Sequence, residues 1–370
     1  MSYIVNKYKN TPAPVTDNEE SFGPIITEFF DKVEALNKQS NNSEGKRYTM
    51  YPIKDTTGYD FYRTMSKQFW VAGEIDFKDD VPDYNKLGKF EQEAVAWILA
   101  SFAHMEGLIN NNIVFRLLAQ SKTMEESAFY GTQMANEIQH SESYSLMIDT
   151  LIQDTKLRNE YFEITASFPV ASEKDKWLES FTKSSLPRDY LLLAYVCAEG
   201  VFFISGFLVI FWLRSVGLMK STVHANSFIA SDETLHRNFG IAMIRKRGNI
   251  HNIPVEDVHG VIDEAVQFEC RFCDAIFRDR DELNYQGQVL KKSDIIYYLK
   301  YLAGMICIDL DVPNENYPKD PSGIPSWMNQ LAMTQKHNFY ETRDAAYSQY
   351  NDDESDSDDE FEQMMNKQKR

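Results

Sequence analysis

Residues that break regular structure are scarce in this sequence. Its 370 residues include only 16 glycines and 12 prolines, and the regular alternation of apolar and polar residues that marks strands is missing. Sandwiches and barrels, which join many short strands through turns, are therefore disfavoured. Long helices are favoured instead, and 43% hydrophobic residues provide enough apolar surface for a substantial core.

Cysteine is also rare. Four cysteines, all within apolar helical sequence, are too few for a disulfide framework. No signal peptide is evident at the start of the chain, so we expect a cytoplasmic location. Cys270 and Cys273 form a C-x-x-C pair, but no second pair accompanies them. Core packing is therefore the better interpretation of these two residues.

Basic residues are too few to balance the acidic ones, and the formal net charge is -18. A chain with this charge repels nucleic acid, so no nucleic-acid partner is expected. Eight carboxylates fall between Asp352 and Glu362. Composition predicts a flexible N-terminal arm over residues 1–45, a helical domain over 46–312 and a flexible C-terminal tail over 313–370.

One long apolar run stands out, from Tyr190 to Leu213, with Glu199 as its only acidic side chain. The run is long enough to cross a bilayer. No second stretch is comparably hydrophobic, and a helix that is apolar on all sides is also what the centre of a large bundle requires. We therefore predict a buried core helix and no membrane partner.

Apolar spacing predicts an all-α fold built from long helices. Thr123 and Glu126 have the spacing of a capping box, which marks the start of one of them. The predicted helices cover residues 59–70, 90–118, 123–152, 187–213, 221–246, 255–278 and 292–308.

Two Glu-x-x-His pairs are the strongest chemical signal. Each pair places a carboxylate and an imidazole on one face of a helix, and two further acids lie in the middle of two other apolar helices. Burying four carboxylates without a positive partner costs several kcal/mol for each. This residue set is the ligand set of di-iron and di-manganese helical bundles, with oxygen and nitrogen ligands that suit iron first and manganese second. The six candidate metal ligands are Glu106, Glu137, His140, Glu199, Glu233 and His236.

Tyr144 follows His140 by four residues and so lies one helical turn from the predicted metals. The chain has 20 tyrosines and 24 phenylalanines, and a tyrosine on an apolar stripe is more often core packing than a redox group. Spacing alone leaves both roles open for Tyr144.

Four segments, in order, resemble the small subunit of class I ribonucleotide reductase: SKQFWVAGEID, EIQHSESY, AEGVFFISGF and SDETLH. The resemblance extends from about residue 51 to residue 347. It implies a ferritin-like bundle that binds two iron ions per chain through the six residues above. It also implies that the centre reacts with O2 and oxidises Tyr144 to a stable radical.

The same resemblance assigns roles to other residues. Phe203, Phe207 and Ile229 match the apolar wall of the radical pocket, and Asp232 matches the carboxylate that orients a ligand histidine. Trp70 and Asp232 would begin a radical-transfer route, and Tyr347 would end it. The resemblance further implies a homodimer whose C-terminal tail docks on the large subunit, where ribonucleotides are reduced.

Three features depart from the family pattern. Glu106 stands where the family commonly has Asp, which bears on coordination and on the choice between iron and manganese. Ser231 stands where many relatives have Arg. The chain ends in EQMMNKQKR rather than in an acidic and aromatic terminus, so Phe361 is a candidate for a displaced docking anchor.

Two alternatives remain open from the sequence. One is an oxygen-activating oxidase or monooxygenase on the same scaffold, with its substrate beside the metals. The other is a metal-storage or structural protein in which Tyr144 is packing and the acidic tail confers solubility. Metal stoichiometry and a radical signal distinguish them from the reductase hypothesis.

Overall fold

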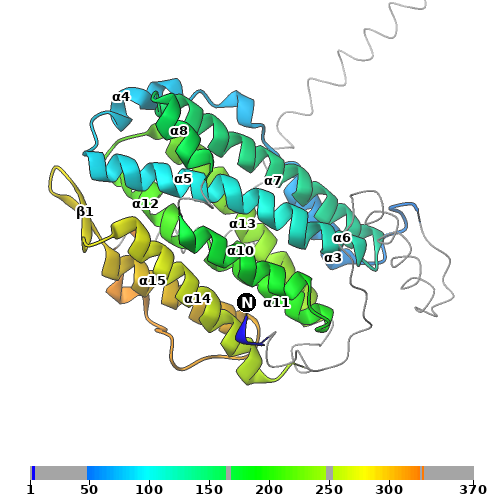
Figure 1. The fold of residues 1–370 in the computed structure, drawn as a ribbon. Helices are drawn as coiled ribbons and strands as arrows, with labels where there is room; N and C mark the ends of the chain where they lie inside the picture. The colour runs from blue at the N-terminus through cyan, green and yellow to red at the C-terminus, as the bar shows by residue number, and fades with distance from the viewer. Residues whose placement is uncertain (1, 5–47, 164–167, 247–252, 326, 329–370) are drawn as a thin grey trace, which may run out of the picture. The chain divides into compact units, whose positions relative to one another are not determined.

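The computed structural model describes residues 2–4, 48–163, 168–246, 253–325 and 327–328 (Figure 1). The chain divides into two units, Met1–Gly323 and Ile324–Arg370. The long helices all lie in the first unit, which confirms the all-α prediction. They are α3 (Thr56–Lys67), α5 (Lys89–Ile109), α6 (Phe115–Ala119), α7 (Met124–Leu151), α8 (Thr155–Phe162), α10 (Pro169–Thr182), α11 (Arg188–Val201), α12 (Ile204–Ser215), α13 (Lys220–Lys246), α14 (Val255–Phe277) and α15 (Lys292–Asp309).

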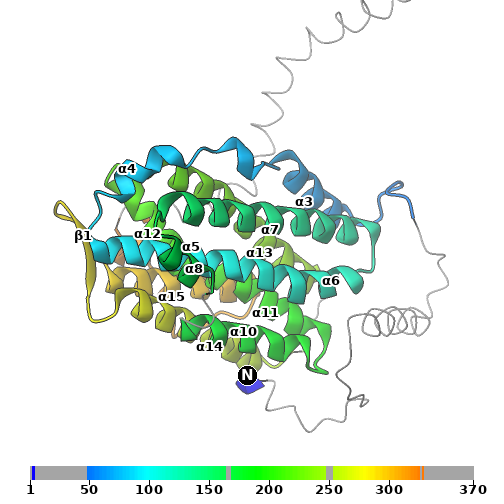
Figure 2. The same ribbon diagram turned by 45° about the horizontal axis from the view of Figure 1, so that its top comes forward.

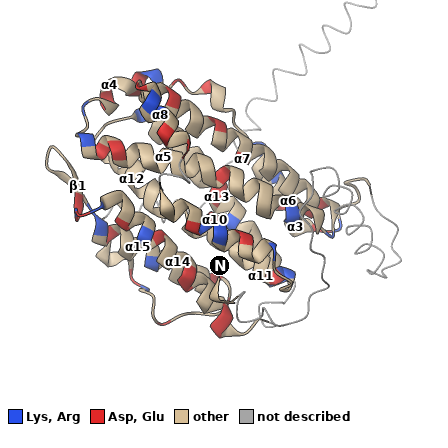
Figure 3. Ribbon diagram, in the orientation of Figure 1, with Lys and Arg blue, Asp and Glu red and all other residues tan. Residues whose placement is uncertain are grey.

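Helices α5, α7, α11 and α13 form the centre of the bundle. Helix α5 packs along α7 and α11 packs along α13, while α3 packs on α7 and α14 packs on α11 and α15. Figure 2 shows α5 and α7 side by side with α3 beside α7. Charged residues of both signs are interspersed along these helices (Figure 3). Because other helices cover the central four, side chains at their midpoints are removed from water.

Helix α7 begins where the capping pattern predicts. The Thr123 hydroxyl accepts a hydrogen bond from the Glu126 backbone N–H at 3.1 Å. The Glu126 carboxylate in turn accepts one from the Lys122 N–H at 3.0 Å. Both bonds satisfy backbone donors that the helix itself leaves unpaired.

The long apolar run lies in the core, as predicted. A stretch from Arg188 to Ser215 is long and apolar enough to span a membrane, but it is buried inside the bundle. The run is divided into two helices, because the chain departs from helical geometry at Phe202 and Phe203, between α11 and α12. Sequence periodicity gave no sign of this break.

Helix α5 also departs from the prediction of one continuous helix over 90–118. Residues Asn110–Val114 form a π-helical turn between α5 and α6, one turn beyond Glu106. The Asn110 amide group donates to the Met134 backbone carbonyl at 3.2 Å, which ties the π-helical turn to α7. Such turns are frequent near functional sites.

The sequence did not predict a β-hairpin of β1 (Glu282–Tyr285) and β2 (Gln288–Lys291), which pair antiparallel. Gln286 and Gly287 form the turn with positive φ angles of 50° and 85°. The remaining short elements are η1 (Ala72–Glu74), η2 (Lys78–Asp80), α4 (Val81–Tyr84) and η5 (Pro321–Gly323).

Most of the predicted N-terminal arm lies outside the described residues. The part of the predicted tail from residue 329 onward lies outside them as well. Ser2 and Ile4 are buried, and the Ser2 N–H donates to Ser180 Oγ at 3.2 Å. After α15, Tyr317 is buried and its hydroxyl donates to Asp263. The division into arm, domain and tail stays a prediction.

Candidate metal centre

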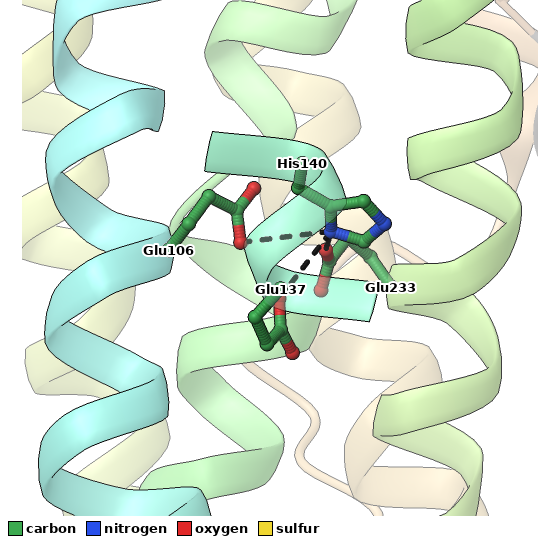
Figure 4. A group of neighbouring side chains, drawn as sticks. All are labelled: Glu106, Glu137, His140 and Glu233. Atoms are coloured by element: carbon green, nitrogen blue, oxygen red, sulfur yellow. Dashed lines mark ion pairs between the residues drawn. The ribbon is translucent and has the colours of Figure 1, made fainter. Parts of the chain in front are cut away.

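The six predicted ligands come together at the centre of the bundle. Helix α5 supplies one acid, α7 and α13 each supply a Glu-x-x-His pair, and α11 supplies the fourth acid. Each of these residues is at most 2% exposed. They form two groups, in each of which one ligand atom per residue lies within 4.8 Å of all the others: Glu106, Glu137, His140 and Glu233 (Figure 4), and Glu137, Glu199, Glu233 and His236.

Glu137 and Glu233 belong to both groups, and each directs one oxygen toward each histidine. His140 Nδ1 lies 3.3 Å from Glu137 Oε2 and 3.0 Å from Glu233 Oε1. His236 Nδ1 lies 3.2 Å from Glu137 Oε1 and 3.4 Å from Glu233 Oε2. Two carboxylates shared between two imidazoles match the ligand set of helical bundles that bind a pair of metal ions.

Glu106 and Glu199 each approach only one histidine. Glu106 Oε2 lies 3.7 Å from His140 Nδ1, and Glu199 Oε2 lies 3.8 Å from His236 Nδ1. Burial and the charge of Glu233 hold the pKa of both Glu106 and Glu199 well above its usual value. The neighbouring imidazoles of His140 and His236 offset only part of this effect.

Glu137 behaves differently from the other acids. Burial alone raises the pKa of its carboxyl, but the neighbouring imidazoles of His236 and His140 lower that pKa to about 2. Burial likewise lowers the pKa of His140, but the adjacent carboxylates of Asp232 and of the cluster acids raise that pKa well above its usual value. The carboxylates and imidazoles of the cluster thus stabilise each other's charges only in part.

A metal pair fits these donors. Within the described part of the chain, several buried ligand atoms find no hydrogen-bond partner, and burying such atoms unpaired is costly. They include Glu106 Oε1 and Oε2, Glu137 Oε2, His140 Nδ1, Glu199 Oε2 and Glu233 Oε1. Carboxylate oxygens and imidazole nitrogens are donors that iron and manganese accept.

Asp232 links this cluster to Trp70. Asp232 Oδ2 lies 3.2 Å from His140 Nε2 and accepts from Trp70 Nε1 at 2.9 Å. The Trp70 ring stacks on the His140 ring with centroids 5.9 Å apart. Gln68, which the sequence did not single out, donates to Asp232 Oδ1 at 2.7 Å. The side chains of Trp70, Asp232 and His140 therefore form one continuous contact.

Tyr144 is fully buried in an aromatic pocket. Its ring lies edge-on to Phe102, with centroids 5.1 Å apart. Phe102 in turn contacts Phe203 and Phe207, with centroids 5.2 and 5.1 Å away. Burial, reinforced by the charge of Glu106, raises the pKa of Tyr144 well above its usual value, so the phenol stays protonated.

The Tyr144 hydroxyl donates to Asn226 Oδ1 at 3.2 Å, and Ile229 on the same helix is also fully buried. The sequence interpretation missed Asn226 and Phe102. Phe102 precedes Glu106 by four residues and Asn226 precedes Glu233 by seven, which are spacings that keep residues on one helical face. The predicted exit residue Tyr347 lies outside the described residues.

Comparison with known proteins places this centre in a family. The family model for the ribonucleotide reductase small chain matches residues 47–321. The protein belongs to this family. Among curated small chains of ribonucleoside-diphosphate reductase, one from Arabidopsis thaliana is 31% identical over 82% of this chain, or 86% of its own length. The small chain of Plasmodium falciparum is 29% identical over 86% of this chain, or 89% of its own.

Solved structures share the fold. The dimanganese(II)-NrdF structure from Streptococcus sanguinis superposes with a TM-score of 0.68 at 19% sequence identity. The superposition covers 77% of this chain and 99% of the NrdF chain. The ribonucleotide reductase Rnr4 homodimer from Saccharomyces cerevisiae gives 0.66 at 22% identity, covering 85% of this chain with 99% of its own. As a small chain of ribonucleoside-diphosphate reductase, the protein carries a dinuclear metal site in the two buried groups.

Proposed function

We propose that this small chain generates and stores an oxidising equivalent as a radical on Tyr144, and delivers it to a large subunit that reduces ribonucleotides to deoxyribonucleotides. The observation that carries the proposal is the position of Tyr144, buried in a phenylalanine pocket one helical turn from His140. The pocket combines closeness to the metal ligands with exclusion of water, as storage of a radical requires.

All six clustered residues are the proposed ligands, and two iron ions per chain are the proposed metals. The chemistry that a bound iron pair supplies is O2 activation, which oxidises a nearby side chain by one electron. Manganese, alone or mixed with iron, is the second candidate, because Glu106 replaces the family's usual Asp. The Streptococcus sanguinis structure named above holds manganese.

The residues of the chain protect the radical. Phe102, Phe203 and Phe207 exclude water from Tyr144, and a dry pocket favours the neutral phenoxyl over charged alternatives. Asn226 orients the hydroxyl through its amide oxygen. An amide is a poor base, so Asn226 positions the phenol but would not itself take the proton that Tyr144 loses when the neutral phenoxyl forms.

Transfer to the large subunit is proposed to begin at the contact of Trp70, Asp232 and His140 and to end at Tyr347. We expect Tyr347→Phe to keep the metals and the Tyr144 radical and to lose turnover with the large subunit. Turnover at the parent rate would remove Tyr347 from the route. A homodimer, tail docking on the large subunit and a cytoplasmic location complete the proposal.

An electron paramagnetic resonance spectrum tests the central claim. The protein is reconstituted with ferrous iron and O2, its metals are counted, and Tyr144→Phe is compared with Tyr161→Phe, a buried tyrosine on α8. We expect about two metals per chain and a tyrosyl signal that only Tyr144→Phe abolishes. If no tyrosyl signal appears with iron, the protein is loaded with manganese and iron together. If no signal appears then either, the result favours the oxidase or storage alternatives.

A further inference from the structure

The side-chain amide of a glutamine donates hydrogen bonds to two of the proposed metal ligands. Gln133 on α7 is fully buried. Its Nε2 donates to Glu137 Oε1 and to Glu199 Oε1, both at 2.8 Å. Its Oε1 accepts from the hydroxyl of Tyr195, also fully buried, at 2.7 Å. Every hydrogen of the amide therefore has a named acceptor.

This arrangement has one amide orientation. The two carboxylates accept hydrogen bonds and do not donate them when ionised, so the NH₂ group must face them. The opposite orientation would place the amide oxygen against two carboxylate oxygens. The Tyr195 hydroxyl can donate or accept, so it adapts to this orientation and donates to Oε1.

Gln133 holds one oxygen of each acid and leaves the other without a hydrogen bond; the held Oε1 of Glu137 also lies 3.2 Å from His236 Nδ1. Glu137 Oε2 and Glu199 Oε2 have no hydrogen-bond partner among the described residues. Glu137 Oε2 lies 3.3 Å from His140 Nδ1, and Glu199 Oε2 lies 3.8 Å from His236 Nδ1. These oxygens face the interior of the cluster, where a metal ion would bind.

Gln133 and Tyr195 form a hydrogen-bonded pair, called the clamp below, that joins α7 to α11. Each of the two precedes a proposed ligand by the same number of residues. Gln133 precedes Glu137 by four residues on α7, and Tyr195 precedes Glu199 by four residues on α11. We propose that Gln133, held by Tyr195, is a positioning residue that fixes Glu137 and Glu199 in the rotamers that bind the metal pair. This inference rests on the metal-ligand roles proposed above.

Anaerobic titration with Mn(II) against a competing chelator tests the clamp. We expect Gln133→Leu to weaken Mn(II) binding roughly 10- to 100-fold, as loss of outer hydrogen bonds to metal ligands generally does. Tyr195→Phe should weaken it by about 10-fold. The double variant should bind no more weakly than Gln133→Leu alone, because Tyr195 acts only through Gln133.

Tyr190→Phe is the matched control. It removes a buried tyrosine hydrogen bond of the same 2.7 Å length from the same helix, but to Asp257 instead of the cluster. It should keep the parent's Mn(II) affinity, and its effect on thermal unfolding measures what a lost tyrosine hydrogen bond costs α11. Should Gln133→Leu not fold, the comparison of Tyr195→Phe with Tyr190→Phe decides the question.

Parent-like Mn(II) affinity in Gln133→Leu and Tyr195→Phe would overturn the clamp while leaving the proposed function intact. Fully additive losses in the double variant would overturn it as well, because they would separate Tyr195 from Gln133. Failure of the parent protein to bind two Mn(II) ions would instead count against the proposed ligands, and the clamp would fall with them.

Discussion

His140 faces the acids with one ring nitrogen and Asp232 with the other. Nδ1 lies among Glu106, Glu137 and Glu233, and Nε2 lies 3.2 Å from Asp232 Oδ2. A carboxylate behind an imidazole fixes its tautomer and makes the opposite nitrogen a better donor to a metal. Asp232 therefore acts on the cluster through His140.

Asp232→Asn should lower metal affinity roughly 10- to 100-fold, because the uncharged amide no longer fixes the Nε2–H tautomer. Asp175→Asn is the control, since Asp175 pairs with His104 at 2.9 Å on the half-buried surface of the bundle. Competition titration of both variants with Mn(II) measures the difference. Equal affinity in the two variants would contradict the role of Asp232.

A buried ion pair hydrogen-bonds the backbone on both sides of the break between α11 and α12. Lys174 Nζ, on α10, donates to the Phe202 backbone carbonyl at 3.1 Å. Its partner Glu269 on α14, 2.6 Å away, accepts from the Ser205 N–H at 2.9 Å. Burial lowers the pKa of Lys174 and raises that of Glu269. The pair thus satisfies backbone groups that the break leaves unpaired.

Lys174→Met should destabilise the protein by about 3 kcal/mol or more, because Glu269 is left buried without its cation. The double variant Lys174→Met with Glu269→Leu should recover much of that loss, since no charge then remains buried. Denaturant unfolding of the metal-free proteins measures both. A single variant as stable as the parent would show that the pair contributes nothing to the break.

Gly206 on α12 lets that helix approach α5. A Cβ at this position would overlap the Phe102 ring and lie 2.8 Å from Ile98 Cγ2. Phe102 is also the ring that contacts Tyr144. The close approach of two helices therefore shapes the wall of the radical pocket.

Gly206→Ala should cost about 1–3 kcal/mol through overpacking and shorten the lifetime of the Tyr144 radical by displacing Phe102. Gly131→Ala is the control, because a Cβ there meets no heavy atom within 4 Å, and alanine favours a helix by roughly 0.5–1 kcal/mol over glycine. Unfolding curves and radical decay are the measurements. An unchanged decay rate in Gly206→Ala would remove Phe102 from the protecting wall.

For the whole molecule, the metal centre links stability to pH. Without metal, the folded-state pKa values of Glu106 and Glu199 lie above their usual 4.5, so the folded chain holds protons that the unfolded chain releases. The stability from raised His140 and His236 pKa values is present below 6.5 and is lost at higher pH. Both effects make the metal-free cluster less favourable as pH rises.

We expect Glu106→Gln to stabilise the metal-free protein more at about pH 8 than at about pH 5.5. In the parent, metal binding should release protons and raise the melting temperature most at the higher pH, because the bound acids must be ionised. Thermal unfolding with and without Mn(II) at both pH values tests this. The same effect of Glu106→Gln at both pH values would show that Glu106 is already ionised without metal.

The local pattern of the sequence determined the helical class, the two Glu-x-x-His pairs, the two lone acids and the buried apolar run. Each of these depends on spacing along one helix, where a period of 3.6 residues fixes which side chains share a face. The start of α7 was predictable for the same reason, since a capping box is local.

Only the tertiary structure showed which residues of different helices contact one another. Gln133 meets Tyr195, Tyr144 meets Phe102 and Asn226, and Lys174 meets the α11–α12 break because distant segments pack together. Helical period specifies the face of a residue but not its neighbour across the core. The sequence therefore determined which groups could bind metal, and packing determined which oxygens they present to it.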